Sequence, residues 1–144
     1  MKHLPTLTLL LSVVFYITAL TQPAFYTTSG DSQNPFPSWA CLAFGIFAIF
    51  RGGVAWLANL PLLFSLIFTM TKFRKLSFIL GIAAFVISLS FFLTDSIMID
   101  ESGFSNKITS YGIGYYLWIG SCNICMIGNA IRYYKPQDPD SAFK

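Results

Sequence analysis

The chain has 144 residues, of which 55% are hydrophobic and 10% are charged, and its mean hydropathy is +0.64. Soluble domains carry about 25% charged residues, so this composition argues against an ordinary water-soluble domain and predicts an integral membrane protein with the lipid bilayer as its solvent. The net charge of +3 is not gathered in a basic run, which argues against nucleic acid as a partner.

The first predicted element is a membrane helix over residues 4–20. Lys2 and His3 precede this apolar run, as in a secretory signal peptide, but no A-x-A-like cleavage site follows it. We therefore expect a retained first crossing. The segment 22–38 that follows is polar and contains three prolines, so it is predicted to be a loop.

The next apolar stretch, residues 39–70, is interrupted by the pair Gly52-Gly53. Its first part, 39–50, would rise only about 18 Å as a helix, whereas the hydrocarbon core of a bilayer is about 30 Å thick. We expect a short re-entrant or interfacial helix in the outer leaflet, ended by the two glycines, because glycine pairs cause sharp kinks. The second crossing is predicted over residues 54–71.

The third and fourth crossings are predicted over residues 76–98 and 111–132, with a polar loop over 99–110. If the N-terminus is cytoplasmic, seven of the nine basic residues lie inside and only Arg51 and Lys107 lie outside, as the positive-inside rule requires. Both termini are then cytoplasmic. The predicted fold is an all-α membrane protein with four transmembrane helices in a compact bundle and one short outer-leaflet helix.

Each predicted crossing carries small or weakly polar residues at helical spacing. On the third crossing these residues are Ser77, Gly81, Ala84 and Ser88. Small residues let helix backbones approach closely in a bilayer. The stripes therefore predict the helix contacts of a single transmembrane domain over residues 1–135, followed by a cytoplasmic tail over 136–144.

The C-x-x-C motif at Cys122 and Cys125 is the first candidate for chemistry. A redox pair usually lies at a helix N-terminus, where the helix dipole lowers the thiol pKa, whereas these cysteines are expected near the middle of the last crossing. A metal site needs further His, Cys or carboxylate ligands, and the lone His3 is at the wrong end of its helix. We therefore predict that the pair serves packing, with no catalytic residue, metal or cofactor.

An alternative keeps these two thiols as catalytic residues. Four-helix membrane thiol oxidases of the disulfide-bond-forming B and vitamin K epoxide reductase type resemble this chain in size, predicted helix number and membrane C-x-x-C. The resemblance implies a quinone cofactor and thiol–disulfide chemistry at Cys122 and Cys125. Those enzymes usually relay electrons through a second cysteine pair in an outer loop, and here the predicted outer side has Cys41 alone.

Two asparagines within the predicted crossings are candidate binding residues. Asn59 stands close to Pro61, whose ring frees a backbone carbonyl; Asn59 is expected either to join two helices at the kink or to line a pocket there. Asn123 points away from the small stripe of its helix. An amide facing lipid needs a partner, and either the segment 39–50 or another protein would supply it.

Charged residues on the predicted outer side are a further candidate site. Arg51 is expected near the outer interface, within reach of Asp95 or Glu101. These groups form either ordinary solvated loops or a recognition surface. No ionisable residue falls at the middle of a predicted crossing, and this disfavours ion-coupled transport.

Two stretches, "VAWLANLPLL" (54–63) and "DESGFSNKITSYGIGYYLWIGS" (100–121), carry a family resemblance. They are similar to small bacterial four-helix membrane proteins with a W-x-A-N-P element and a later E-x-G…Y-G-x-G-Y-x-L-W element. The resemblance implies a four-helix fold and a bacterial inner membrane, and it implies no activity.

The sequence as a whole favours a non-enzymatic integral membrane protein that binds another membrane or secreted protein. Immunity proteins against membrane-targeting toxins are an analogous class of small helical proteins. The first alternative is the quinone-linked thiol oxidoreductase, and the second is a small-molecule carrier.

Overall fold

The computed structural model describes residues 4–29, 32–48, 53–98 and 105–134. Its helical segments, two of them short 3-10 helices (η2 and η3), are α1 (Leu4–Leu20), α2 (Ser38–Ala48), η2 (Val54–Ala58), α3 (Asn59–Thr69), α4 (Arg74–Leu89), η3 (Ser90–Leu93) and α5 (Ile113–Tyr134). Its strands are β1 (Pro23–Ser29), β2 (Ser32–Pro37), β3 (Ser96–Met98) and β4 (Ser105–Tyr111).

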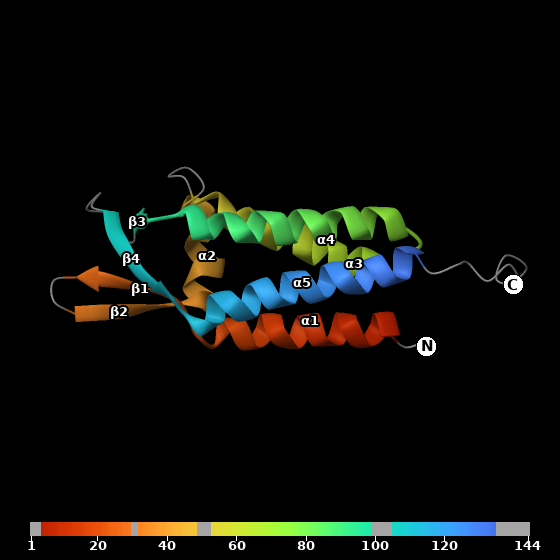
Figure 1. Cartoon of the computed structure of the whole chain (residues 1–144), viewed down its shortest axis with the longest axis horizontal. Helices are drawn as coiled ribbons and strands as arrows, with labels where there is room; N and C mark the ends of the chain where they lie inside the picture. Colours follow the sequence, from red (N-terminus) through yellow and green to blue (C-terminus); the bar gives the residue numbers. More distant parts are fainter. Residues whose placement is uncertain (1–3, 30–31, 49–52, 99–104, 135–144) are drawn as a thin grey trace, which may run out of the picture.

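The molecule is elongated, with a helical part and a sheet that projects from one end of it (Figure 1). Helix α5 packs along α1 on one side and along α4 on the other, and α3 packs against α4. The short helix α2 runs across the long helices at the sheet end (Figure 1). The start of α1 and the end of α5 both lie at the end of the molecule opposite to the sheet (Figure 1).

The sheet has the strand order β2-β1-β4-β3, and all neighbouring strands are antiparallel. Strand β1 contains Phe25, Tyr26 and Thr27, residue types that fit a pleated surface. Strand β1 lies inside the sheet because β4, which is distant in sequence, pairs with its other edge, for example at Phe25↔Tyr111. The edge strand β2 contains prolines at 35 and 37, as edge strands tolerate.

The predicted all-α fold with four transmembrane helices is wrong. Segments expected to be loops, 22–38 and 99–110, contribute strands to one antiparallel sheet. Within the described ranges, one helical segment, Arg74–Leu93, is long and apolar enough to cross a membrane by length and composition. The expected second crossing consists of η2 and the 11-residue α3, and the third ends at η3 because the chain then enters β3.

The predicted small-residue stripes are confirmed as the contacts between helices. The buried residues of α4 are Ser77, Gly81, Ala84 and Ser88. A Cβ added to Gly81 would lie 3.1 Å from the backbone of Met126 on α5. The two helices therefore approach closely because the stripe lacks bulk.

Serine pairs join the helices inside these stripes. The Ser12 hydroxyl donates to the Ser121 carbonyl at 2.9 Å, and the Ser121 hydroxyl returns a bond to the Ser12 carbonyl at 2.9 Å. Ser65 and Ser77 exchange bonds in the same way at 2.7 and 2.9 Å. Each pair satisfies both buried hydroxyl groups and links α1 to α5 or α3 to α4.

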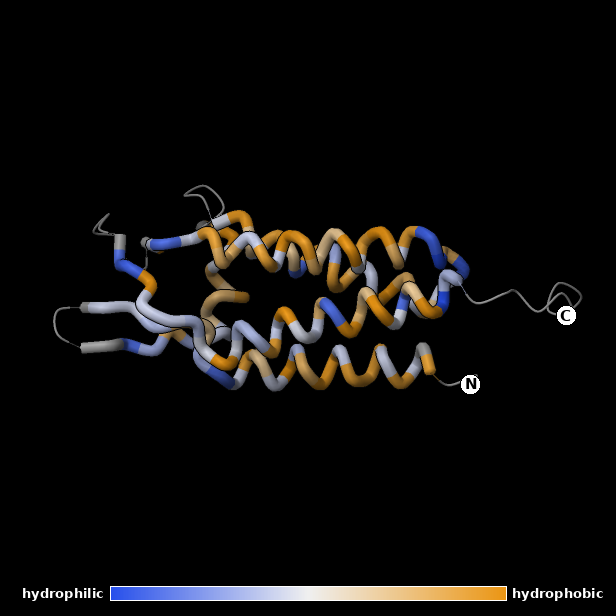
Figure 2. Tube along the Cα trace, in the orientation of Figure 1, coloured by the Kyte–Doolittle hydropathy of each residue, from blue (hydrophilic) through white to orange (hydrophobic). Residues whose placement is uncertain are grey.

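Large apolar side chains lie mainly on the outside of the helices. Leu7 on α1, Ile67 on α3 and Val86 on α4 are about 60% exposed, whereas the serines between the helices are fully buried. Figure 2 shows hydrophobic residues along the helices and more hydrophilic ones in the sheet and at the opposite helix ends. Exposed large apolar side chains are therefore frequent on the outer faces of the helices, and small or weakly polar side chains fill many of the contacts between them.

Candidate functional site

A cavity of about 760 Å³ lies where α2 passes between the sheet and the long helices. The residues that line it come from α1, β1, β2, α2, η2, α3, η3, β3 and α5. Most of the lining side chains are aromatic or aliphatic. No Asp, Glu, Lys, Arg or His is among the described residues that line the cavity. This size and lining are typical of a small-molecule site.

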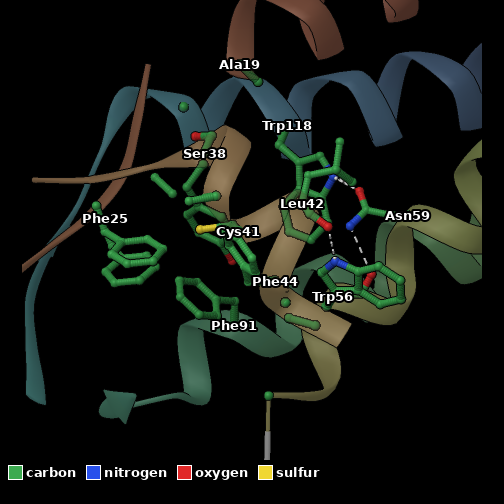
Figure 3. A pocket seen from close by; sticks show the side chains of 18 of the residues that line it. Ala19, Phe25, Ser38, Cys41, Leu42, Phe44, Trp56, Asn59, Phe91 and Trp118 are labelled. Carbon is green, nitrogen blue, oxygen red and sulfur yellow. Dashed lines mark hydrogen bonds between the residues drawn. The ribbon is translucent and has the colours of Figure 1, made fainter. Parts of the chain in front are cut away.

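Aromatic rings form the sheet-side wall of this cavity (Figure 3). The rings of Phe25 and Phe36 are stacked with centroids 5.0 Å apart, and Phe91 lies 5.6 Å from Phe25. On the α5 side, Tyr115 packs edge-on against Phe91 at 5.1 Å, and its hydroxyl donates to the Ser88 carbonyl at 3.0 Å. The wall is held by packing and by this hydrogen bond.

Asn59 is the polar centre of the other side of the cavity (Figure 3). Its Oδ1 accepts from the Trp118 indole at 3.0 Å and from the Tyr16 hydroxyl at 3.1 Å, while its Nδ2 donates to the Trp56 carbonyl at 3.0 Å. An indole N–H only donates and a carbonyl only accepts, so these partners determine the orientation of the amide. Asn59 therefore both joins helices and lines a pocket, the two roles that the sequence left open.

Trp56 connects α2 to the rest of the cavity wall. Its indole nitrogen donates to the Leu42 carbonyl at 3.0 Å. A Cβ on Gly45 would collide with the same indole ring, so a glycine is required where α2 passes η2. Together these contacts hold α2 over the cavity.

Cys41 lines the cavity, while the C-x-x-C pair does not. Cys41 is partly buried and its thiol is free; burial raises the pKa of this thiol. Cys122 and Cys125 are also free thiols, and both are buried among Leu62 and Ala84. The Cys125 sulfur lies 3.4 Å from the Ser65 hydroxyl, within the helix contact.

We expect the double substitution Cys122→Ser/Cys125→Ser to leave the protein folded and functional. Serine suits a small-residue stripe and can bond back to its own helix, so the free energy of unfolding should fall by less than about 2 kcal/mol. Thermal unfolding of the detergent-solubilised protein measures this. A double variant that folds normally but loses a thiol-dependent activity would instead support the oxidoreductase alternative.

Asn123 lies near the middle of α5 and is only partly buried. Its side chain makes no hydrogen bond to any residue in the described ranges, whereas Asn129, six residues later, makes three. Helices α1, α4 and α3 pack along α5, and α2 is not among the elements with extensive contacts to it. The sequence hypothesis that residues 39–50 supply the partner of Asn123 therefore receives no support.

The predicted charged cluster falls mostly outside the described residues. Arg51 and Glu101 belong to that part of the chain, so their pairing stays a prediction. Asp95 is exposed between η3 and β3, and its backbone carbonyl accepts from the Ile108 N–H at 2.9 Å. The end of the predicted outer-leaflet helix, residues 49–50, also lies outside the described ranges.

Sequence reasoning missed most of the cavity. Tyr16 and Trp118 lie in segments that were predicted to be membrane crossings, and Phe25 and Phe36 lie in a segment that was predicted to be a loop. The proximity of Asn59 to Pro61 was the only signal for a pocket, because the other lining residues meet through the sheet and α2. Within the described ranges, no group of three or more metal-ligating side chains is found.

The chain matches no family model, no curated protein and no solved structure.

Proposed function

We propose that the helical part of the protein lies in a lipid bilayer. The support is the inverted distribution of side chains, with leucine, isoleucine and phenylalanine outside and serine, glycine and asparagine between the helices. Hydrocarbon solvates such an apolar exterior, and small or hydrogen-bonded residues hold helices together there. The apolar segment Arg74–Leu93 has the length that a crossing requires.

We propose that the sheet faces the outside and that the helix ends remote from it face the cytoplasm. Lys72, Arg74 and Lys75 lie at the α3–α4 turn, and Arg132 lies beside them, since its guanidinium donates to the carbonyls of Phe68 and Thr71. Basic residues favour the cytoplasmic side. The family resemblance extends this proposal to a bacterial inner membrane, and the distribution of basic residues extends it to two cytoplasmic termini.

Single-cysteine labelling tests this orientation. In a chain whose three native cysteines are serine, Thr109→Cys on β4 should react with an impermeant maleimide in intact cells. Lys72→Cys should react only after the membrane is permeabilised. The reverse pattern would contradict the orientation, and equal labelling of both sites in intact cells would contradict the membrane placement.

The function that we propose is non-enzymatic binding of another membrane or secreted protein, through the face of α5 that carries Asn123. The observation that supports it is an amide without a partner in the described ranges, between exposed Tyr116 and Ile127 on the same side of the helix. In hydrocarbon an unpaired amide costs free energy. A polar group on another helix would satisfy it, with a gain of about 1–2 kcal/mol.

Co-purification from native membranes tests the proposal. We expect mass spectrometry to identify a protein partner with the tagged wild type, with recovery about tenfold lower for Asn123→Leu. Asn123→Gln keeps the amide and serves as the matched control, which should retain the partner. Undiminished recovery with Asn123→Leu, or recovery no higher than with an untagged strain for the wild type, would contradict the proposal.

A further inference from the structure

We propose that the cavity between α2, the sheet and the long helices binds an uncharged amphipathic molecule, whose carbonyl-type oxygen accepts a hydrogen bond from Asn59. The cavity is a different surface from the face of α5 around Asn123, and it does not include Asn123. This inference therefore goes beyond the proposed function and does not depend on it.

The walls of the cavity define the body of the ligand. A volume of about 760 Å³ falls within the range that encloses most of a drug-sized molecule. The walls carry the rings of Phe25, Phe91 and Trp56. Such a surface contributes mainly through the burial of apolar area, so the body of the ligand is an alkyl, prenyl or aryl group.

The amide of Asn59 defines the polar end of the ligand. Its Oδ1 is occupied by the donors of Tyr16 and Trp118, and one hydrogen of Nδ2 is occupied by the Trp56 carbonyl. Among the described residues, the second Nδ2 hydrogen has no acceptor. Asn59 is buried, and a buried donor without an acceptor costs free energy. A ligand oxygen is the complementary group.

The described part of the cavity lining favours a neutral ligand. No cationic or anionic side chain there offers a counter-charge. Burying an unpaired carboxylate or ammonium group is far more costly than burying a carbonyl.

The experiment uses the full-length detergent-solubilised protein and radiolabelled oleamide, an uncharged C18 carboxamide. Binding should be saturable with one oleamide per protein chain. Oleate at pH 9 has the same chain with an anionic head, and it should bind at least about tenfold more weakly. Equal affinity for the two compounds, or no saturable oleamide binding, would overturn the proposal.

Substitutions in the lining test whether oleamide binds in this cavity. Asn59→Asp keeps oxygen acceptors for Tyr16 and Trp118 but removes the amide donor, and it should weaken oleamide binding by about tenfold. Asn106→Asp on β4 makes the same chemical change outside the cavity lining and should bind as the wild type does.

Cys41→Phe leaves the hydrogen bonds of Asn59 intact and fills part of the cavity, so it should weaken oleamide binding by about tenfold even if Asn59→Asp does not fold. Unchanged oleamide binding by Cys41→Phe would overturn the proposal. Recovery of a protein partner through Asn123 would be unaffected by that result.

Discussion

Replacing Gly112 with alanine should lower the free energy of unfolding by about 3–5 kcal/mol or prevent folding altogether. Gly112 joins β4 to α5, and its N–H donates to the Ala24 carbonyl at 2.8 Å. A Cβ there would collide with the carbonyl group of Pro23, whose carbon would lie 2.8 Å away. This obstacle is backbone, so relief requires the start of β1 to move away from α5.

Gly120→Ala, within α5, is the matched control. A Cβ at residue 120 would lie 3.1 Å from the ring of Phe15, and a side chain on the neighbouring helix can rotate to make room. Alanine also favours the helix by up to about 1 kcal/mol relative to glycine, so the net change should stay within about 1 kcal/mol. Thermal unfolding in detergent measures both variants, and equal losses would contradict the predicted backbone collision.

Asn129→Leu should be the most destabilising polar substitution between the helices, with a loss of about 2–3 kcal/mol. The Asn129 amide nitrogen donates to the Ser65 hydroxyl at 2.8 Å, and its Oδ1 lies 2.7 Å from the Thr69 hydroxyl. Asn129 is almost completely buried. Leucine has a similar volume, so the loss reports the broken hydrogen bonds between α5 and α3 and not a cavity.

Asn123→Leu on the same helix is the comparison for this substitution. The Asn123 side chain has no hydrogen bond within the described ranges, so the isolated protein should lose less than about 0.5 kcal/mol or become more stable. Urea or thermal unfolding of the purified variants measures the difference. A loss for Asn123→Leu as large as that for Asn129→Leu would mean that Asn123 is satisfied inside the chain, and the proposed partner face would lose its support.

The positions of the long helices and of their packing faces were predictable from local sequence. Residues 4–20 were predicted to be a helix, and α1 has the same bounds. The buried residues of α4 are the four small residues that were singled out at helical spacing. Both predictions depend on local sequence. A helix makes its backbone hydrogen bonds within itself, and it places residues three and four apart on one side, so the helix and its packing face are encoded within a few turns.

The candidate site was much less predictable. Asn59 could be selected because it stands close to Pro61 in an apolar segment, but its donors come from α1 and α5. The rings of Phe25 and Phe36 could not be assigned to a wall, since they stand in polar, proline-containing segments without a clear alternation of apolar residues. Arg51 and Glu101 lie outside the described residues, so their predicted role stays open to experiment.

The sequence by itself determined the helical segments, the small-residue contacts between them and the apolar character of their outer faces. Only the tertiary structure decided that residues 23–29 and 105–111 form a sheet, and that α2 closes a cavity against it. The physical reason is the range of the interactions. A strand gains its hydrogen bonds from a partner that the local sequence does not specify, and a cavity exists only where several separate elements meet.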